Sequence, residues 1–134
     1  MSEINWDLLW DEARKMLKLA YCPYSKFPVG AAAFTTDGKL ITGCNVENAS
    51  YGLGLCAECG IVSDLARQGG GTLAALVVVA SDGQPVAPCG RCRQLLWEHG
   101  GRTLQIMSSN GPIAFSTLLP DAFGPDDLAT RSTS

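Results

Sequence analysis

The stretch that most constrains the fold of this chain is the run LAALVVVA, residues 73–80. A continuous apolar run rich in valine is typical of a β-strand that is covered on both faces. Such a strand needs helices above and below the sheet. The chain carries helical patterns on either side of the run, at residues 5–20 and 56–68 before it and at 88–100 after it. The order of elements therefore predicts an α/β fold, a three-layer α/β/α domain.

Further strands are predicted around this run. Residues 29–36 and 39–47 read as a β-hairpin, because Asp37-Gly38 between them is a strong signal for a two-residue turn. The chain has no internal repeat and no linker, and its 134 residues fit one domain. We therefore expect a single domain over residues 1–134, with a flexible tail from about residue 126.

Charge narrows the classes of partner. The net charge is −3, the pI is about 5.0, and there is no run of Lys or Arg, whereas binding to nucleic acid or to an anionic membrane needs a basic face. The N-terminal MSEINWDLLW is acidic and amphipathic, unlike a signal peptide. No apolar stretch approaches the length of a membrane span. These features predict a cytoplasmic protein that binds neither nucleic acid nor membrane.

Four of the six cysteines occur as two Cys-x-x-Cys pairs, LCAECG and PCGRC. A disulfide framework is not expected in a chain that is large enough to bury a core in a reducing compartment. Both pairs fall at the predicted starts of helices, where free N–H groups and the positive end of the helix dipole stabilise thiolates. Thiolates brought together from two helix starts are typical zinc ligands.

The residues alone leave two kinds of zinc site open. Four cysteines could close a structural site, in which case a Cys59→Ser substitution would release the metal. Three cysteines could instead hold zinc with one position open, where Glu58 could act on whatever fills it. The segment between Cys59 and Cys89 contains a helix and a buried strand, which is longer than the usual 15 to 20 residues between structural knuckles. A redox role for the Cys-x-x-Cys pairs is a third reading.

The motifs resemble a known family. CAE followed by PCGRC is similar to the zinc nucleobase deaminases, in which a Glu follows one ligand by two positions and Pro-Cys-x-x-Cys supplies two others. FPVGAA, GCNVENASYG, LCAE, PCGRCRQ and LLPDAFGPDDL together resemble the small, homotetrameric cytidine deaminases, in that family's order and over most of the chain. The resemblance implies a mixed central sheet and hydrolysis of cytidine and deoxycytidine to uridine, deoxyuridine and ammonia, in pyrimidine salvage.

The resemblance also implies roles for individual residues. Cys56, Cys89 and Cys92 would hold one zinc ion per chain, with a water in the fourth position. Glu58 would shuttle a proton from that water to N3 of the pyrimidine and then to the departing ammonia.

The substrate would be a small nucleoside held in active sites shared within a homotetramer. Asn45 and Glu47 would bind the ribose hydroxyls, Phe27 would pack on the base, and the backbone at Ala57 would bond to the pyrimidine edge. The remaining residues with an implied role are Val46, Asn48, Ala49 and Ser50 in the nucleoside-binding stretch, and Tyr51 and Phe123, which resemble residues that reach into a neighbouring subunit's site.

One position departs from the family pattern. Many members carry an Arg directly after the catalytic Glu, where it bonds to the thiolates, whereas this chain has Cys59 there. We expect Arg91 or Arg93 to supply the missing positive charge, and Gln94 to steady a ligand loop. Two related enzymes stay open as alternatives: a deaminase of another aminopyrimidine nucleoside with a modified sugar, and an editor of polynucleotides, which the acidic charge disfavours.

Overall fold

The computed structural model describes residues 3–131. Its five strands form one sheet in the order β2-β1-β3-β4-β5. The elements are α1 (Trp6–Leu17), β1 (Gly30–Thr35), β2 (Leu40–Cys44), η1 (Tyr51–Leu53), α2 (Ala57–Arg67), β3 (Leu73–Val79), α3 (Gly90–Gly100), η2 (Gly101–Thr103), β4 (Gln105–Ser108), β5 (Gly111–Ala114), η3 (Phe115–Thr117) and α4 (Pro125–Arg131).

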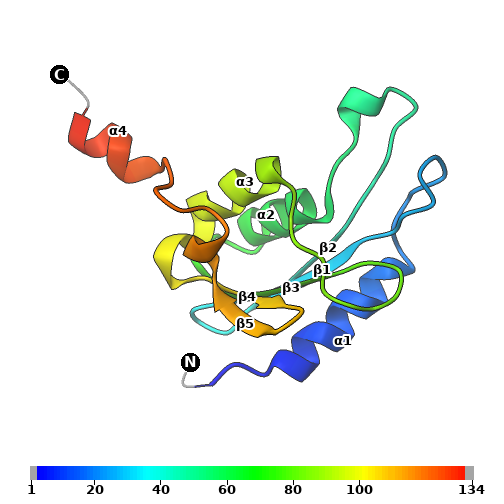
Figure 1. The fold of residues 1–134 in the computed structure, drawn as a ribbon, viewed down its shortest axis with the longest axis horizontal. Coiled ribbons are helices and arrows are strands. Elements are labelled where there is room, and N and C mark those ends of the chain that lie inside the picture. Colours follow the sequence, from blue (N-terminus) through cyan, green and yellow to red (C-terminus); the bar gives the residue numbers. More distant parts are fainter. Residues whose placement is uncertain (1–2, 132–134) are drawn as a thin grey trace.

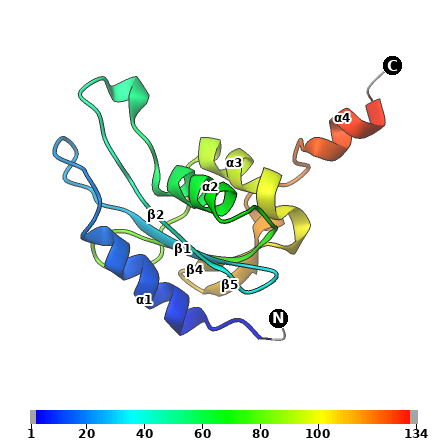
Figure 2. The same ribbon diagram turned by 180° about the vertical axis from the view of Figure 1, so that it is seen from behind.

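The elements form three layers. Helix α1 covers one face of the sheet, and α2 and α3 lie side by side on the other face (Figures 1 and 2). The sheet is mixed, because β3 and β4 run parallel while the other neighbouring strands run antiparallel. This arrangement confirms the predicted α/β/α class with a mixed sheet. None of the helices within residues 3–131 is long and apolar enough to cross a lipid bilayer.

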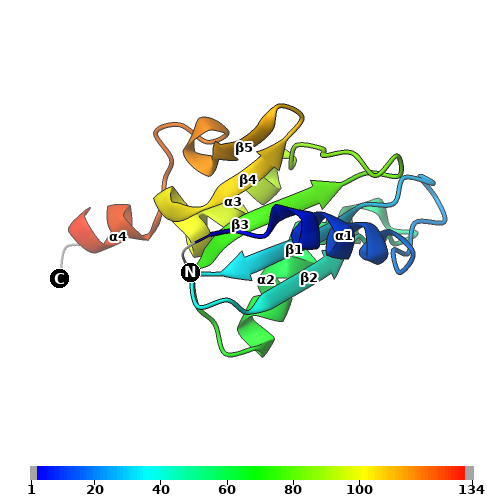
Figure 3. The same cartoon turned by 90° about the horizontal axis from the view of Figure 1, so that it is seen from below.

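The apolar run at residues 73–80 is the central strand β3, between β1 and β4 (Figure 3). Its side chains alternate between two cores. Leu76 and Val78 belong to the core under α2 and α3, while Val77 and Val79 belong to the core under α1. All four side chains are at most 1% exposed. Burial on both faces is the reason that the run is apolar throughout, as the sequence predicted.

The C-terminal stretch holds a short helix. The sequence predicts a flexible tail from about residue 126; the structure gives helix α4 up to Arg131, and residues 132–134 lie outside the described part. Proline is favoured at the first position of a helix, where Pro125 stands. The backbone N–H of Gly124 donates to Oδ2 of Asp127 at 2.9 Å, and this bond joins the residue before the helix to its first turn. Figure 1 shows α4 projecting from the body of the molecule.

Helix α2 packs on strand β2 with no side chain between the two backbones at one point. A Cβ atom added to Gly43 would lie 2.4 Å from the carbonyl oxygen of Ala57 and 2.8 Å from the amide nitrogen of Ile61. A Cβ atom on Gly60 would lie 3.0 Å from Cα of Gly43. Glycine is therefore required at both positions for the observed close approach of backbone to backbone.

We expect a Gly43→Ala substitution to lower the free energy of unfolding by about 1–3 kcal/mol, because the methyl group overpacks a contact between two backbones. Chemical denaturation monitored by circular dichroism would measure the loss. Gly52→Ala is the matched control, since a Cβ atom there meets nothing within 4 Å, and it should change stability by less than about 0.5 kcal/mol. Equal stabilities of the two variants would contradict the close approach.

Candidate metal centre and active site

Three cysteine side chains meet where α2 and α3 begin. Cys56 is the N-cap residue of α2, Cys89 is the N-cap residue of α3, and Cys92 is buried within the first turn of α3. Their sulfur atoms lie within 4.8 Å of one another. Tetrahedral zinc with Zn–S bonds of about 2.3 Å places its sulfur ligands about 3.8 Å apart. The cluster therefore fits one zinc ion held by three thiolates.

The helix starts were expected to favour thiolates, and the pKa is lowered for only one of the three clustered cysteines. The pKa of Cys89 is lowered, chiefly because the backbone N–H of Cys92 donates a hydrogen bond to its sulfur. The pKa values of Cys56 and Cys92 are instead raised, chiefly by burial away from water. Free N–H groups at the start of α3 thus stabilise the thiolate of Cys89 through the backbone alone.

Cys59 lies outside the cluster. Among residues 3–131, the group placed to hold a metal contains Cys56, Cys89 and Cys92 without it. Nη1 of Arg91 donates to Sγ of Cys59 at 3.6 Å. A closed four-cysteine site is therefore not formed, and three thiolates leave the fourth position of a tetrahedral ion open.

The two arginines of PCGRCR have separate contacts. A hydrogen bond to Cys59 holds the Arg91 side chain beside the thiols. The Arg93 side chain donates to two backbone carbonyls, from Nε to Pro88 at 2.9 Å and from Nη1 to Leu118 at 3.0 Å. Of the two candidates for the compensating charge, Arg91 is the one placed beside the cysteines.

Gln94 is placed differently from expectation. Its Nε2 donates to the carbonyl oxygen of Phe123 at 2.8 Å, so it holds the C-terminal segment on α3 instead of steadying a ligand loop. The segment follows α3 closely, because a Cβ atom on Gly124 would lie 2.9 Å from Nε1 of Trp97.

A cavity of about 630 Å³ opens beside the cysteine cluster. Cys56, Cys89 and Glu58 line it, together with Val78 of the central strand. The Glu58 side chain is only 4% exposed, and burial raises the pKa of its carboxyl group. A buried carboxyl group with a raised pKa, beside a metal site in a cavity, is suited to accept and return a proton.

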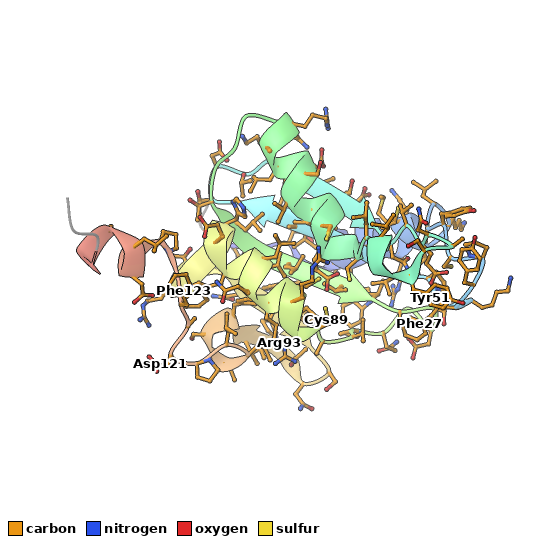
Figure 4. All side chains as sticks on the ribbon, turned by 90° about the horizontal axis from the view of Figure 1, so that it is seen from above. Phe27, Tyr51, Cys89, Arg93, Asp121 and Phe123 are labelled. Atoms are coloured by element: carbon orange, nitrogen blue, oxygen red, sulfur yellow. The ribbon has the colours of Figure 1, made fainter. Side chains whose placement is uncertain are left out.

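The cavity brings together most of the predicted substrate residues. Its lining includes Phe27, Asn45, Val46, Glu47, Asn48, Tyr51 and Ala57. Ala49 and Ser50 are exposed loop residues outside that lining. Phe123 lies at the opposite end of the molecule from Phe27 and Tyr51, so it cannot serve the cavity of its own chain (Figure 4).

Further lining residues were not predicted. They are Tyr24, Ser25, Val29, Gly54, Leu55, Val78, Val86 and Ala87. Four of them lie in two segments, CPYSKFP and the stretch just before PCGRC. Their closeness in sequence to motif residues could have indicated that they lie near the cavity. The sequence does not indicate, however, which residues of a loop turn inward.

Polar side chains of residues 45–47 bind the loop that carries Phe27. Oδ1 of Asn45 accepts from the N–H of Val29 at 2.9 Å, and its Nδ2 donates to the carbonyl oxygen of Phe27 at 3.0 Å. Oε1 of Glu47 accepts from the N–H groups of Tyr24 and Ser25 at 3.0 and 3.1 Å. These bonds join the two loops that form the wall of the cavity.

The mouth of the cavity is aromatic. The rings of Tyr24 and Tyr51 meet edge to face with their centroids 6.2 Å apart. Phe27 and Tyr51 lie at the same end of the molecule (Figure 4) and are 49% and 81% exposed. Exposed aromatic rings that line a cavity are suited to pack on a flat ligand or on a partner.

Sequence comparison agrees with this geometry. The profile of the family described as "Cytidine and deoxycytidylate deaminase zinc-binding region" matches residues 5–108. A cytidine deaminase of Mycobacterium tuberculosis is 53% identical over 128 residues, which cover 96% of each chain. A cytidine deaminase of Sporosarcina psychrophila is 42% identical over 123 residues, which cover 88% of this chain and 90% of that protein.

Solved structures give the same result. The crystal structure of cytidine deaminase from Mycobacterium tuberculosis matches with a TM-score of 0.88 at 52% identity, covering 91% of this chain and 99% of the other. That of cytidine deaminase from Mycobacterium leprae matches with a TM-score of 0.87 at 54% identity, covering 89% and 100%. With the cavity, the thiol cluster and Glu58 in place, the chain belongs to the family of cytidine and deoxycytidylate deaminase zinc-binding domains.

Proposed function

We infer that this chain is a zinc-dependent enzyme of pyrimidine salvage that hydrolyses cytidine and deoxycytidine to uridine and deoxyuridine with release of ammonia. The observation that carries this function is the buried carboxyl group of Glu58 beside three clustered thiols, in a cavity of about 630 Å³. The family supports the same reaction.

The test is an assay of the purified protein with each nucleoside, following the loss of cytosine absorbance beside a zinc count per chain. Turnover with one zinc per chain is the expected result. Zinc without turnover on either nucleoside would contradict the proposed substrates and would direct the search to other aminopyrimidines.

Zinc is the cofactor, at one ion per chain, and we assign its ligands as Cys56, Cys89 and Cys92. Bound zinc would supply a nucleophile at neutral pH by lowering the pKa of water to about 7. Glu58 would move one proton of the attacking water to N3 of the pyrimidine, and then the second proton, from the hydroxyl formed at C4, to the amino group, which leaves as ammonia. Burial raises the pKa of the Glu58 carboxyl group, which makes it a better proton acceptor than an exposed glutamate.

The walls of the cavity orient the nucleoside. We assign Asn45 and Glu47 to the sugar, Phe27 to the face of the base, and the backbone of Ala57 to the pyrimidine edge. Asn45 and Glu47 are already held by the loop of residues 22–29, so their polar atoms are pre-organised for the sugar. A sugar hydroxyl that pairs with such groups contributes to discrimination, because its loss leaves a polar group unpaired.

We also propose that the chain functions as a homotetramer whose active sites are shared. Phe123 and Leu128 are 57% and 63% exposed on the projecting C-terminal segment. Tyr51, Leu53 and Leu55, near the cavity mouth, are 51% to 81% exposed. Apolar patches of this kind mark interaction surfaces. We assign Phe123 of one subunit to the cavity of another, which its position far from its own cavity supports (Figure 4).

We place the reaction in the cytoplasm. All six cysteines of the chain are free thiols, and a reducing compartment preserves thiols for metal binding.

We expect an Arg91→Gln substitution to weaken zinc retention by roughly 10-fold, which is the usual size of an effect from a group one contact beyond the ligands. Three thiolates around Zn²⁺ carry net negative charge, and the Arg91 guanidinium lies beside them through Cys59. Competition with a chelator would measure the change. Arg102→Gln removes the same charge from an exposed position outside the cavity lining and is the control. Equal retention in both variants would contradict the role of Arg91.

A further inference from the structure

Ser25 lies between two residues that we assign to the substrate. Its hydroxyl donates a hydrogen bond to Oε2 of Glu47 and accepts one from the N–H of Phe27 at 3.0 Å. Its own N–H donates to Oε1 of Glu47 at 3.1 Å. Ser25 therefore contacts the carboxylate on the sugar side and the backbone of the ring on the base side, and it lines the cavity itself.

The contacts leave Glu47 little free acceptor capacity. A carboxylate offers about four acceptor positions, two on each oxygen. The N–H groups of Tyr24 and Ser25 occupy both positions of Oε1, and the Ser25 hydroxyl occupies one of Oε2. One position on Oε2 remains, so Glu47 can accept a hydrogen bond from one sugar hydroxyl. The Ser25 hydroxyl also fixes the rotation of the carboxylate, and thereby the direction of that remaining position.

The backbone around Ser25 shows the same constraint. Lys26 is left-handed, with φ of 59°, a conformation that is uncommon for residues other than glycine. This conformation, closed by a bond from the N–H of Lys26 to the carbonyl oxygen of Cys22 at 3.1 Å, turns the N–H of Phe27 back onto the Ser25 hydroxyl. Asn45 holds the other side of Phe27 through its carbonyl oxygen. The position of the Phe27 ring thus depends on the contact between Ser25 and Glu47.

We propose that Ser25 is a positioning residue that couples recognition of the sugar at Glu47 to packing of the base at Phe27. This inference rests on the proposed function. Ser25 has no contact with the cysteine cluster or with Glu58 among the hydrogen bonds of the described residues, so its effect falls on binding of the nucleoside and not on proton transfer.

We expect Ser25→Ala to raise KM for cytidine by roughly tenfold, which is the usual effect of losing a hydrogen bond to a charged group, while kcat stays within about threefold. Ser25→Thr keeps the hydroxyl and should restore most of the affinity. Ser109→Ala removes an exposed serine hydroxyl from the turn between β4 and β5 and is the matched control. Melting curves of all variants would separate a loss of binding from a loss of folding.

A second comparison tests the coupling directly. The wild type and Ser25→Ala would be assayed with cytidine, 2′-deoxycytidine and 3′-deoxycytidine. In the wild type, removal of the hydroxyl that Glu47 accepts should raise KM, and in Ser25→Ala that penalty should shrink by at least threefold, because the carboxylate is no longer held in one orientation. Interacting groups are non-additive in this way.

The outcomes separate the two claims. A wild type that does not deaminate any of the three nucleosides contradicts the proposed function. If the wild type is active, the proposed function stands. The role of Ser25 is then contradicted if Ser25→Ala leaves KM unchanged, if its kcat falls as much as its KM rises, or if removal of a sugar hydroxyl raises KM equally in both proteins.

Discussion

A Glu58→Gln enzyme is expected to turn cytidine over at least ~10²-fold more slowly than the wild type, a loss of about 2.7 kcal/mol of transition-state stabilisation. The amide keeps the size of the side chain, but it cannot take a proton from water or return one to ammonia. Glu58 is 4% exposed and lines the cavity beside the thiols. The other carboxylate of the lining, Glu47, is held by the N–H groups of Tyr24 and Ser25.

Steady-state assays under saturating cytidine would measure this loss, with zinc counted in the same preparations. Zinc should remain at one per chain, because Glu58 is not among the three clustered thiols. Glu98→Gln changes an exposed glutamate of α3 and is the matched control, with turnover close to that of the wild type. Near-normal turnover in Glu58→Gln would remove Glu58 from the mechanism.

The second large effect is expected from the cysteines. Cys92→Ala removes a buried thiol of the cluster and should abolish stable zinc binding. Turnover should fall by more than ~10³-fold, because the metal contributes several kcal/mol to generating the nucleophile. Cys59→Ser, by contrast, should keep both zinc and most of the activity, since Cys59 lies outside the cluster.

Zinc per chain measured by atomic emission, together with turnover, distinguishes the two variants. Release of zinc by Cys59→Ser would show that Cys59 is a fourth ligand, which would contradict the three-cysteine site. The pair of variants thus tests the open coordination position independently of Glu58.

The layers of this fold were predictable from the sequence because their signals are local. The apolar run at residues 73–80 became the two-sided strand β3, and Asn5 caps α1 by accepting from the N–H of Leu8 at 3.1 Å. Likewise, Cys56 and Cys89 stand at the two helix starts where they were expected. Caps, turns and periodicity depend on neighbouring residues, which a sequence displays directly.

Other features depend on contacts across the fold and could not be predicted. Spacing left Arg91 and Arg93 equivalent, and only the packing of α3 beside α2 shows that Arg91 approaches Cys59. Ser25 lies outside the motifs that carry the family resemblance, and its hydrogen bond to Glu47 appears only once the loop at residues 22–28 is placed against Glu47. The helix at the C-terminus, Pro125–Arg131, was not predicted, because a single short helix at the end of a chain shows too little periodicity to be read from the sequence.

The contact of Gly43 with the first turns of α2 has a consequence for substrate length. Strand β2 ends at Cys44, just before Asn45 and Glu47, which we assign to the sugar, while Cys56, which we assign to the metal, is the N-cap residue of α2. Because the backbones of β2 and α2 touch at Gly43, the spacing between the main chain of these residues and that of Cys56 is set by a backbone contact and not by side-chain packing. We therefore expect the proposed site to accept only a narrow range of distances from the sugar to C4 of the base, and a nucleoside with a longer or shorter span to bind weakly.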